Sequence, residues 1–186
     1  MSRVEKAIQR EFKDLSGVKE EIIDGFRHIK YHLPTAKTPS NIVFMNSVCT
    51  SSAFSSQKEI GIGLERYLGK NSPVIKDLPN DMFFDWIKEG LDRRYLVRDA
   101  FCSWIMTHYI AETDGNLAEH IIRWGKILYL TEAALPDSPE SIIPRYSEED
   151  YKWALENEYA LWKYLVDQKM LFKIDELNKT NLLNVI

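Results

Sequence analysis

The sequence predicts an α+β fold that is mostly α-helical, in which a small β-sheet is wrapped by five to seven helices. Apolar residues recur every three or four positions over most of the chain, which is the period of an amphipathic helix. Only between residues 41 and 65 does this period give way to short, partly alternating segments. With 186 residues, 45% of them apolar, the chain can bury one core, so we expect a single domain over residues 1–186.

The N-terminal thirty residues are expected to form two short helices or one kinked helix. Between residues 2 and 31 the apolar positions keep a helical spacing on either side of Gly17. The following segment, "LPTAKTPSN", contains Pro34 and Pro39. Proline has no backbone N–H to donate, so the helical pattern should end there.

Two strands are expected near residues 41–48 and 57–65, joined by the polar loop "TSSAFSSQ". The second strand runs into "GIGLERYLGK", which we interpret as close strand packing followed by a helical turn and a cap at Gly69. Its glycines lack the G-x-G-x-x-G spacing and the lysine of a phosphate-binding loop, so no nucleotide site is predicted there.

From Leu78 onward the pattern is helical again, near residues 80–89, 92–112, 116–134, 147–170 and 175–184. The helix at 147–170 is rich in tryptophan and tyrosine. Apolar residues lie on two opposite faces of it, and Glu158 stands in the middle of one face. We therefore expect this helix to be packed on both sides.

Charge and targeting signals restrict the function classes. Twenty-four basic and 28 acidic residues give a net charge of -4, with no run of like charges that would favour nucleic-acid binding. No apolar stretch reaches the ~18 residues of a membrane span, and Met1 leads into a charged segment unlike a signal peptide. Cys49 and Cys102 form no C-x-x-C pair, although they could form a disulfide in an oxidising compartment.

The segment "NLAEHIIRWGKILYL" is a candidate for a metalloprotease motif, because Glu119 and His120 stand side by side near its start. The inverted zinc motif reads H-x-x-E-H, and Asn116 occupies the position of its first histidine. On a helix, Glu119 belongs to a charged stripe with Arg123 one turn later, and His120 lies at the edge of that stripe. We therefore expect no metal site here, with His120 a weak candidate ligand.

The other histidines give similarly weak signals. His28 and His32 have the i, i+4 spacing of a shared metal ion, but they precede Pro34, and two exposed histidines near a helix end are expected. His108 falls on an apolar face and should be a buried, hydrogen-bonded histidine. An H-E-x-x-H motif ending at His108 would need histidine and glutamate where Trp104 and Ile105 stand. No nucleophile–base pair is found, and no cofactor is expected.

Four segments, "HLPTAKTP", "GIGLERYLGK", "WGKILYLTEAALPDSP" and "YKWALENEYALWKYL", resemble the GldB-like gliding-motility lipoproteins of Bacteroidetes in order and spacing. The likeness covers roughly residues 25–170. The matching positions include Pro34, Pro39, Gly63, Leu64, Tyr67, Leu68, Gly69, Gly125, Lys126, Tyr129, Pro136, Trp153, Glu156, Asn157, Glu158 and Trp162.

This resemblance implies a lipid-anchored envelope protein needed for gliding and the linked secretion machinery, with protein partners and no established catalytic activity. It also implies a scaffold distantly similar to zinc-dependent proteases of the zincin type, without their metal motif. Zincin relatives place a ligating glutamate before the glycine of the "WGKILYL" segment, where this chain has Trp124, and an indole cannot bind zinc. The chain lacks the lipoprotein signal and ends before a further segment of the family, so we expect a short relative or a fragment.

Our leading hypothesis is a non-catalytic envelope accessory protein. The alternatives are a zincin-like peptidase or hydrolase with unrecognised ligands among the four histidines, and a helical binding module without a gliding role. Two structural expectations accompany them. Glu158 should pair with Lys126 or His108 if it is buried, because an unpaired buried carboxylate costs several kcal/mol. The apolar tail of Leu182, Leu183, Val185 and Ile186 should cover a groove on the same molecule or a neighbour.

Overall fold

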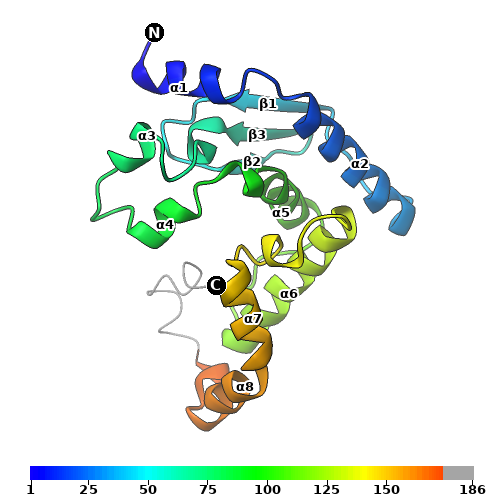
Figure 1. The fold of residues 1–186 in the computed structure, drawn as a ribbon. Helices are drawn as coiled ribbons and strands as arrows, with labels where there is room; N and C mark the ends of the chain where they lie inside the picture. The colour runs from blue at the N-terminus through cyan, green and yellow to red at the C-terminus, as the bar shows by residue number, and fades with distance from the viewer. Residues whose placement is uncertain (174–186) are drawn as a thin grey trace.

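The computed structural model describes residues 1–173, and it confirms a mostly helical α+β fold built on a small sheet (Figure 1). One cluster of buried apolar side chains joins the N-terminal helices, the sheet and the two long central helices. The helix predicted at 175–184 and the apolar tail lie outside the described residues.

Of the two N-terminal alternatives, two helices are present, but the break lies before Gly17, which belongs to the second helix. Helix α1 (Arg3–Glu11) begins with a capping box, in which the Ser2 hydroxyl accepts from the Glu5 backbone and the Glu5 carboxylate accepts from the Ser2 backbone. Helix α2 (Ser16–His32) follows after a short break. Its buried face consists of Val18, Ile22, Gly25, Phe26 and Ile29.

The sheet has three strands, one more than the sequence predicts. Strands β1 (Asn41–Met45) and β3 (Glu59–Gly63) lie within the two expected ranges. The extra strand, β2 (Ala53–Ser55), lies within the segment that was predicted to be a polar loop because of its serines. The order is β1-β3-β2, with β1 parallel and β2 antiparallel to β3. On the outer face the Phe54 ring covers Gly61, where a Cβ atom would meet it at 2.1 Å.

Helix α5 (Leu96–His108) packs against β2 and β3 and forms the centre of the molecule. The Ser103 hydroxyl lies 3.0 Å from that of Ser55 in β2. The Trp104 indole donates to the Lys37 carbonyl in the connection between α2 and β1. Helix α5 is therefore held to the sheet and to the segment that precedes it.

The remaining elements surround this centre. Helix α6 (Leu117–Ala134) matches its predicted range and packs on α2 and α5. The predicted helix at 92–112 is a 3-10 turn, η2 (Arg93–Tyr95), followed by α5, and it ends at His108. The other short elements are η1 (Leu64–Tyr67), α3 (Pro73–Lys76), α4 (Asp85–Glu89), η2 (Arg93–Tyr95) and η3 (Glu140–Ile142).

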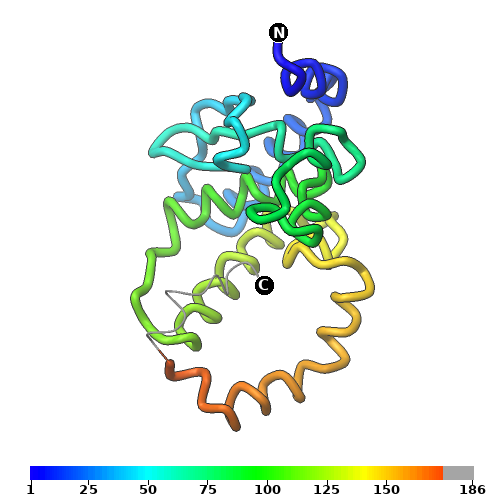
Figure 2. The backbone as a smooth tube through the Cα atoms, turned by 90° about the vertical axis from the view of Figure 1, so that its left-hand side faces the viewer, coloured from blue at the N-terminus to red at the C-terminus, as the bar shows by residue number. Residues whose placement is uncertain are grey.

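The C-terminal arch, residues 147–173, differs most from expectation. The single helix predicted at 147–170 is two helices, α7 (Glu148–Glu156) and α8 (Glu158–Asp167), separated at Asn157, and a 3-10 turn η4 (Met170–Phe172) follows. The Lys173 carbonyl accepts from the Leu117 backbone at the start of α6. The arch therefore leaves the core after η3 and returns to α6 at its far end (Figure 2).

Among residues 1–173, none of the helices is both long and apolar enough to cross a membrane.

We expect the contact of α2 with α5 and α6 at Gly25 to limit substitution there. A Cβ atom at Gly25 would lie 2.4 Å from the Phe101 ring and 3.1 Å from the Ala134 carbonyl. Gly25→Val should therefore lower the free energy of unfolding in urea by ~1–3 kcal/mol. The matched control is Gly17→Ala in the same helix, where nothing lies within 4 Å and where alanine should be neutral or slightly stabilising. Equal stability of Gly25→Val and the parent would contradict this packing.

Candidate functional site

The four histidines do not come together. His108 is half-buried, stacked on Trp104 with ring centroids 3.8 Å apart, and its Nε2 lies 3.0 Å from the Ser56 carbonyl. The predicted hydrogen bond is confirmed, whereas the predicted burial is wrong, because His108 is the last residue of α5 and is only half-buried. His32 is exposed at the end of α2 as expected, whereas the expectation is wrong for His28, whose Nδ1 lies 3.1 Å from the Ala134 carbonyl. The His28 ring therefore lies against the end of α6, whereas the His32 ring is exposed to solvent.

The segment around His120 is a helix start. The Asn116 side chain accepts from the Glu119 backbone at 3.1 Å, so the residue at the position of a motif histidine is an N-cap. His120 is half-buried, and its side chain makes no hydrogen bond or ion pair with other described residues. Across residues 1–173 no three His, Cys, Asp or Glu side chains are grouped so that they could hold a metal ion.

The predicted pairing of Glu158 with Lys126 or His108 is wrong. Glu158 and Lys126 are both exposed, and His108 bonds to the sheet. The physical reason is the break at Asn157, whose side-chain amide and backbone N–H both donate to the Trp153 carbonyl. A helical projection over residues 147–170 assumes one continuous helix. It therefore places Glu158 on an apolar face that the two separate helices do not form.

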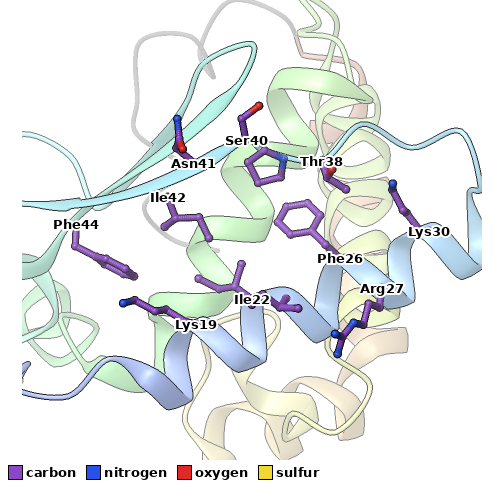
Figure 3. Close-up of a pocket in the computed structure, with 12 residues that line it drawn as sticks. Lys19, Ile22, Phe26, Arg27, Lys30, Thr38, Ser40, Asn41, Ile42 and Phe44 are labelled. Carbon is purple, nitrogen blue, oxygen red and sulfur yellow. The ribbon is translucent and has the colours of Figure 1, made fainter.

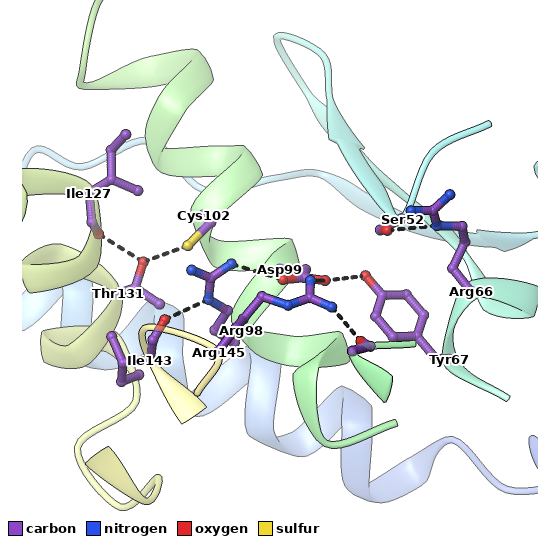
Figure 4. Close-up of polar contacts among 11 residues, drawn as sticks. Ser52, Arg66, Tyr67, Arg98, Asp99, Cys102, Ile127, Thr131, Ile143 and Arg145 are labelled. Atoms are coloured by element: carbon purple, nitrogen blue, oxygen red, sulfur yellow. Dashed lines mark hydrogen bonds and ion pairs between the residues drawn. The ribbon is translucent and has the colours of Figure 1, made fainter. Parts of the chain in front are cut away.

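Two of the buried charged residues, Arg98 and Asp99, instead belong to a cluster around the Asp99 carboxylate on α5 (Figure 4). One oxygen of the Asp99 carboxylate accepts from the Tyr67 hydroxyl at 2.8 Å and from Arg145 at 2.7 Å. The other oxygen accepts from Arg98 at 3.0 Å, and Arg98 also donates to the Ile143 carbonyl at 2.7 Å. Two cations and a phenol therefore satisfy one buried carboxylate.

Tyr67 and Cys102, the neutral residues in and beside the cluster, stay protonated. Burial, followed by the adjacent Asp99 carboxylate, raises the pKa of Tyr67 well above its ordinary value. Burial also raises the pKa of the Cys102 thiol, which lies 3.2 Å from the Thr131 hydroxyl. Cys102 and Cys49 are both free thiols, so the disulfide that the sequence allowed is not formed. Tyr67 thus acts as a hydrogen-bond donor and Cys102 as a buried thiol.

Arg98, Asp99 and Cys102 stand at the i, i+1 and i+4 positions of α5, which is the spacing of an H-E-x-x-H motif. Here the three side chains bond to protein groups: Arg98 to Ile143, Asp99 to two arginines and a tyrosine, and Cys102 to Thr131. The cluster is organised as a structural network.

A second buried carboxylate, Glu65, is enclosed by the loop after β1. Its Oε1 accepts from the backbone N–H groups of Ser47 and Cys49 and from the Ser47 hydroxyl, while its Oε2 is buried without a partner among the described residues. Val48 and Cys49 both have positive φ angles, of 55° and 59°. No sequence signal indicated this arrangement, since a glutamate in "GLERYLGK" reads as a solvated side chain.

The C-terminal arch carries a group of exposed apolar side chains. Neither α7 nor α8 contains a buried residue, so the expectation of a helix packed on both sides is wrong. The exposed fraction is 56% for Trp153, 81% for Tyr159 and 44% for Trp162. The other exposed apolar residues of the arch are Leu155, Leu161, Tyr164, Val166 and Phe172. Exposed apolar surface of this kind is typical of sites that contact another molecule.

The family-motif residues divide between core and surface. Tyr67 is buried on Asp99, Gly63 is buried where a Cβ atom would meet the Ser51 carbonyl at 2.3 Å, and Gly69 has a φ of 81°, as the predicted cap requires. Asn157 is half-buried at the break between α7 and α8. The exposed members are Gly125, Lys126, Tyr129, Trp153, Glu158 and Trp162.

The fold and these sites define a helical α+β protein in which Asp99 and two arginines bond to one another and aromatic side chains are exposed on a C-terminal arch. The family model described as gliding motility protein GldB matches residues 1–185. The chain therefore belongs to the GldB family of gliding-motility proteins, as the resemblance of its sequence segments predicted. Comparison with curated proteins and with solved structures gave no match.

We expect Asp99 to be required for stability. Asp99→Ala leaves Arg98 buried beside no carboxylate, and it should lower the free energy of unfolding by ~3–5 kcal/mol, as breaking a buried ion pair does. Asp99→Asn, which keeps an acceptor oxygen, should cost less. The control is Asp81→Ala, because Asp81 is exposed and should stay within ~0.5 kcal/mol of the parent. Urea unfolding measures all three, and equal stabilities of the two alanine variants would contradict a structural role for the cluster.

Proposed function

We propose that this protein is a non-catalytic accessory component of the gliding-motility machinery and its linked protein-secretion apparatus, located at the cell envelope. It works by binding a protein partner through the C-terminal arch. Membership of the GldB family supports the connection with gliding. The observation that carries the binding role is the unpacked aromatic surface of α7 and α8.

The composition of the arch supports a protein partner. Tryptophan and tyrosine are the residues that contribute most to binding energy at protein interfaces, because they bury a large area at a small cost in side-chain entropy. Trp153, Tyr159 and Trp162 supply them here with more than two fifths of each side chain exposed. A helix that carries such residues without a covering element is incomplete until something packs on it.

The distribution of ionisable groups supports a non-catalytic role. Asp99, Arg98 and Arg145 bond to one another and to the backbone, and His108 bonds to the sheet. A general acid or base needs access to a substrate proton, and the buried Arg98 and Asp99 are 8% and 6% exposed. The competing hypothesis of a metal-dependent hydrolase has no ligand cluster to rest on within residues 1–173.

Colony spreading of the bacterium that encodes the chain tests the binding role. We expect the triple variant Trp153→Ser, Tyr159→Ser, Trp162→Ser to abolish spreading at an unchanged protein level, because the interface loses its aromatic anchors. Tyr31→Ser is the matched control, since Tyr31 is 83% exposed but lies on α2. Spreading of the triple variant at the parent rate would exclude the arch as the partner site.

A companion measurement separates a partner from the chain's own C-terminal segment. If that segment covers the arch, deletion of residues 174–186 should increase binding of a hydrophobic dye, and the increase should disappear in the triple variant. Dye binding unaffected by the deletion leaves the arch available to another protein, as we propose.

Elemental analysis of the purified protein tests the non-catalytic role. We expect no stoichiometric zinc and no cleavage of a peptide substrate, because Asn116 and Trp124 stand where a zinc site would need ligands. About one zinc per chain, lost in His108→Ala or His120→Ala, would favour the hydrolase instead.

A further inference from the structure

A groove between α2 and β1 lies on a part of the protein that the proposed function does not use (Figure 3). It has a volume of about 520 Å³. Its apolar lining comes from one face of α2, from the side chains of β1 that point toward that helix, and from Pro39 in the connection between them. These lining residues are Ile22, Ile23, Phe26, Pro39, Ile42 and Phe44.

Strand β1 presents an unpaired backbone edge along this groove. The backbones of Ser56 and Gly63 donate to Glu59 and Ser52, so the alternate β3 residues Glu59, Gly61 and Gly63 bond to β2. Ile60 and Ile62 therefore direct their backbone groups to β1.

In a parallel pair with Asn41 opposite Glu59, the bonding residues of β1 are then Asn41, Val43 and Met45. It follows that the N–H and C=O groups of Ile42 and Phe44 point away from the sheet. No other described segment bonds to them.

The rim of the groove is cationic, although the whole chain has a net charge of -4. Lys19, Arg27 and Lys30 belong to the lining, which contains no aspartate or glutamate. Arg27 is paired with Asp24 on α2, whereas Lys19 and Lys30 form no ion pair with other described residues. Two cations beside an apolar groove favour an occupant that is acidic and partly apolar.

We propose that this groove binds an extended, acidic segment of another protein, which adds a strand to the free edge of β1. The Ile42 and Phe44 backbone groups pair with the segment, its alternate apolar side chains enter the groove, and its carboxylates meet Lys19 and Lys30. The unpaired edge is what favours a peptide over a lipid, because an acyl chain cannot bond to backbone N–H and C=O groups.

The probe is a labelled peptide of alternating glutamate and valine, seven residues long, with a lysine–valine peptide as its counterpart. The glutamate peptide should bind the full chain more tightly. The double variant Lys19→Glu, Lys30→Glu should weaken its binding about tenfold. The control double variant Lys6→Glu, Lys13→Glu changes the net charge equally at exposed lysines outside the groove, and it should bind like the parent.

Backbone pairing is tested separately from charge. Two further peptides carry N-methyl groups on either the glutamate or the valine residues, which removes alternate N–H donors. Only one of them should lose binding, because a paired strand presents one set of N–H groups to β1. Hydrogen exchange in the complex should show new protection at the Ile42 and Phe44 amides, with little change at Val43, which is already paired.

Three results would overturn the proposal. Equal effects of the two N-methylated peptides would exclude strand pairing. Binding of anionic phosphatidylglycerol vesicles that depends on Lys19 and Lys30, without protection of Ile42 and Phe44, would make the groove a lipid site. The third result is that the parent binds no peptide and the Lys19→Glu, Lys30→Glu variant aggregates. In that case the two lysines only prevent association of the strand edge with other chains.

Discussion

The carboxylate of Asp99 is the interaction on which the arrangement of the segments depends. It lies on α5 and receives hydrogen bonds from Tyr67, which follows β3, and from Arg145, which precedes the arch. Arg145 also donates to the Gly90 carbonyl and stacks over the Tyr95 ring at 4.7 Å. A single buried charge therefore fixes the sheet, the segment around η2 and the start of the arch against one helix. Because each partner comes from a different part of the chain, the cluster forms only when the whole fold does.

This constraint explains why α5 can be buried on nearly every side. A helix that packs on a sheet and on two other helices has no solvated face for polar residues, so its charges must be satisfied internally. Arg98 and Asp99 satisfy one another in part, and Cys102 meets the hydroxyl of Thr131 on α6. The same burial removes these groups from contact with substrate. The burial of Arg98, Asp99 and Cys102 and the contribution of their hydrogen bonds to stability thus have one physical cause.

Sequence patterns predicted those elements whose signals are local. The proline-marked end of α2, the extent of α6 and the left-handed cap at Gly69 all follow from residues within one or two turns. Strand β2 could not be predicted, because Ala53–Ser55 is a strand only through its pairing with β3. Glu65 and Asp99 were also missed as buried groups, since the donors that make their burial possible are distant in sequence or come from backbone N–H groups.

The arch illustrates a different limit of the sequence. Its aromatic content resembles that of a core helix, and the periodicity over residues 147–170 could not reveal that packing partners are missing among the described residues. The hydrophobicity of a side chain determines how much free energy its burial gains, but it does not indicate which molecule buries it.

For two surfaces of this chain the question is which molecule covers them, and the two differ in chemistry. The arch offers aromatic side chains, and the β1 edge offers backbone hydrogen-bond groups beside Lys19 and Lys30. A side-chain surface selects a partner by shape, whereas a strand edge accepts many sequences and selects through charge and the pockets beside it. Since the two surfaces belong to different elements, occupation of one does not geometrically require occupation of the other. If both surfaces are occupied as we propose, an extended segment on β1 and a folded partner on the arch bind to separate elements, so neither excludes the other.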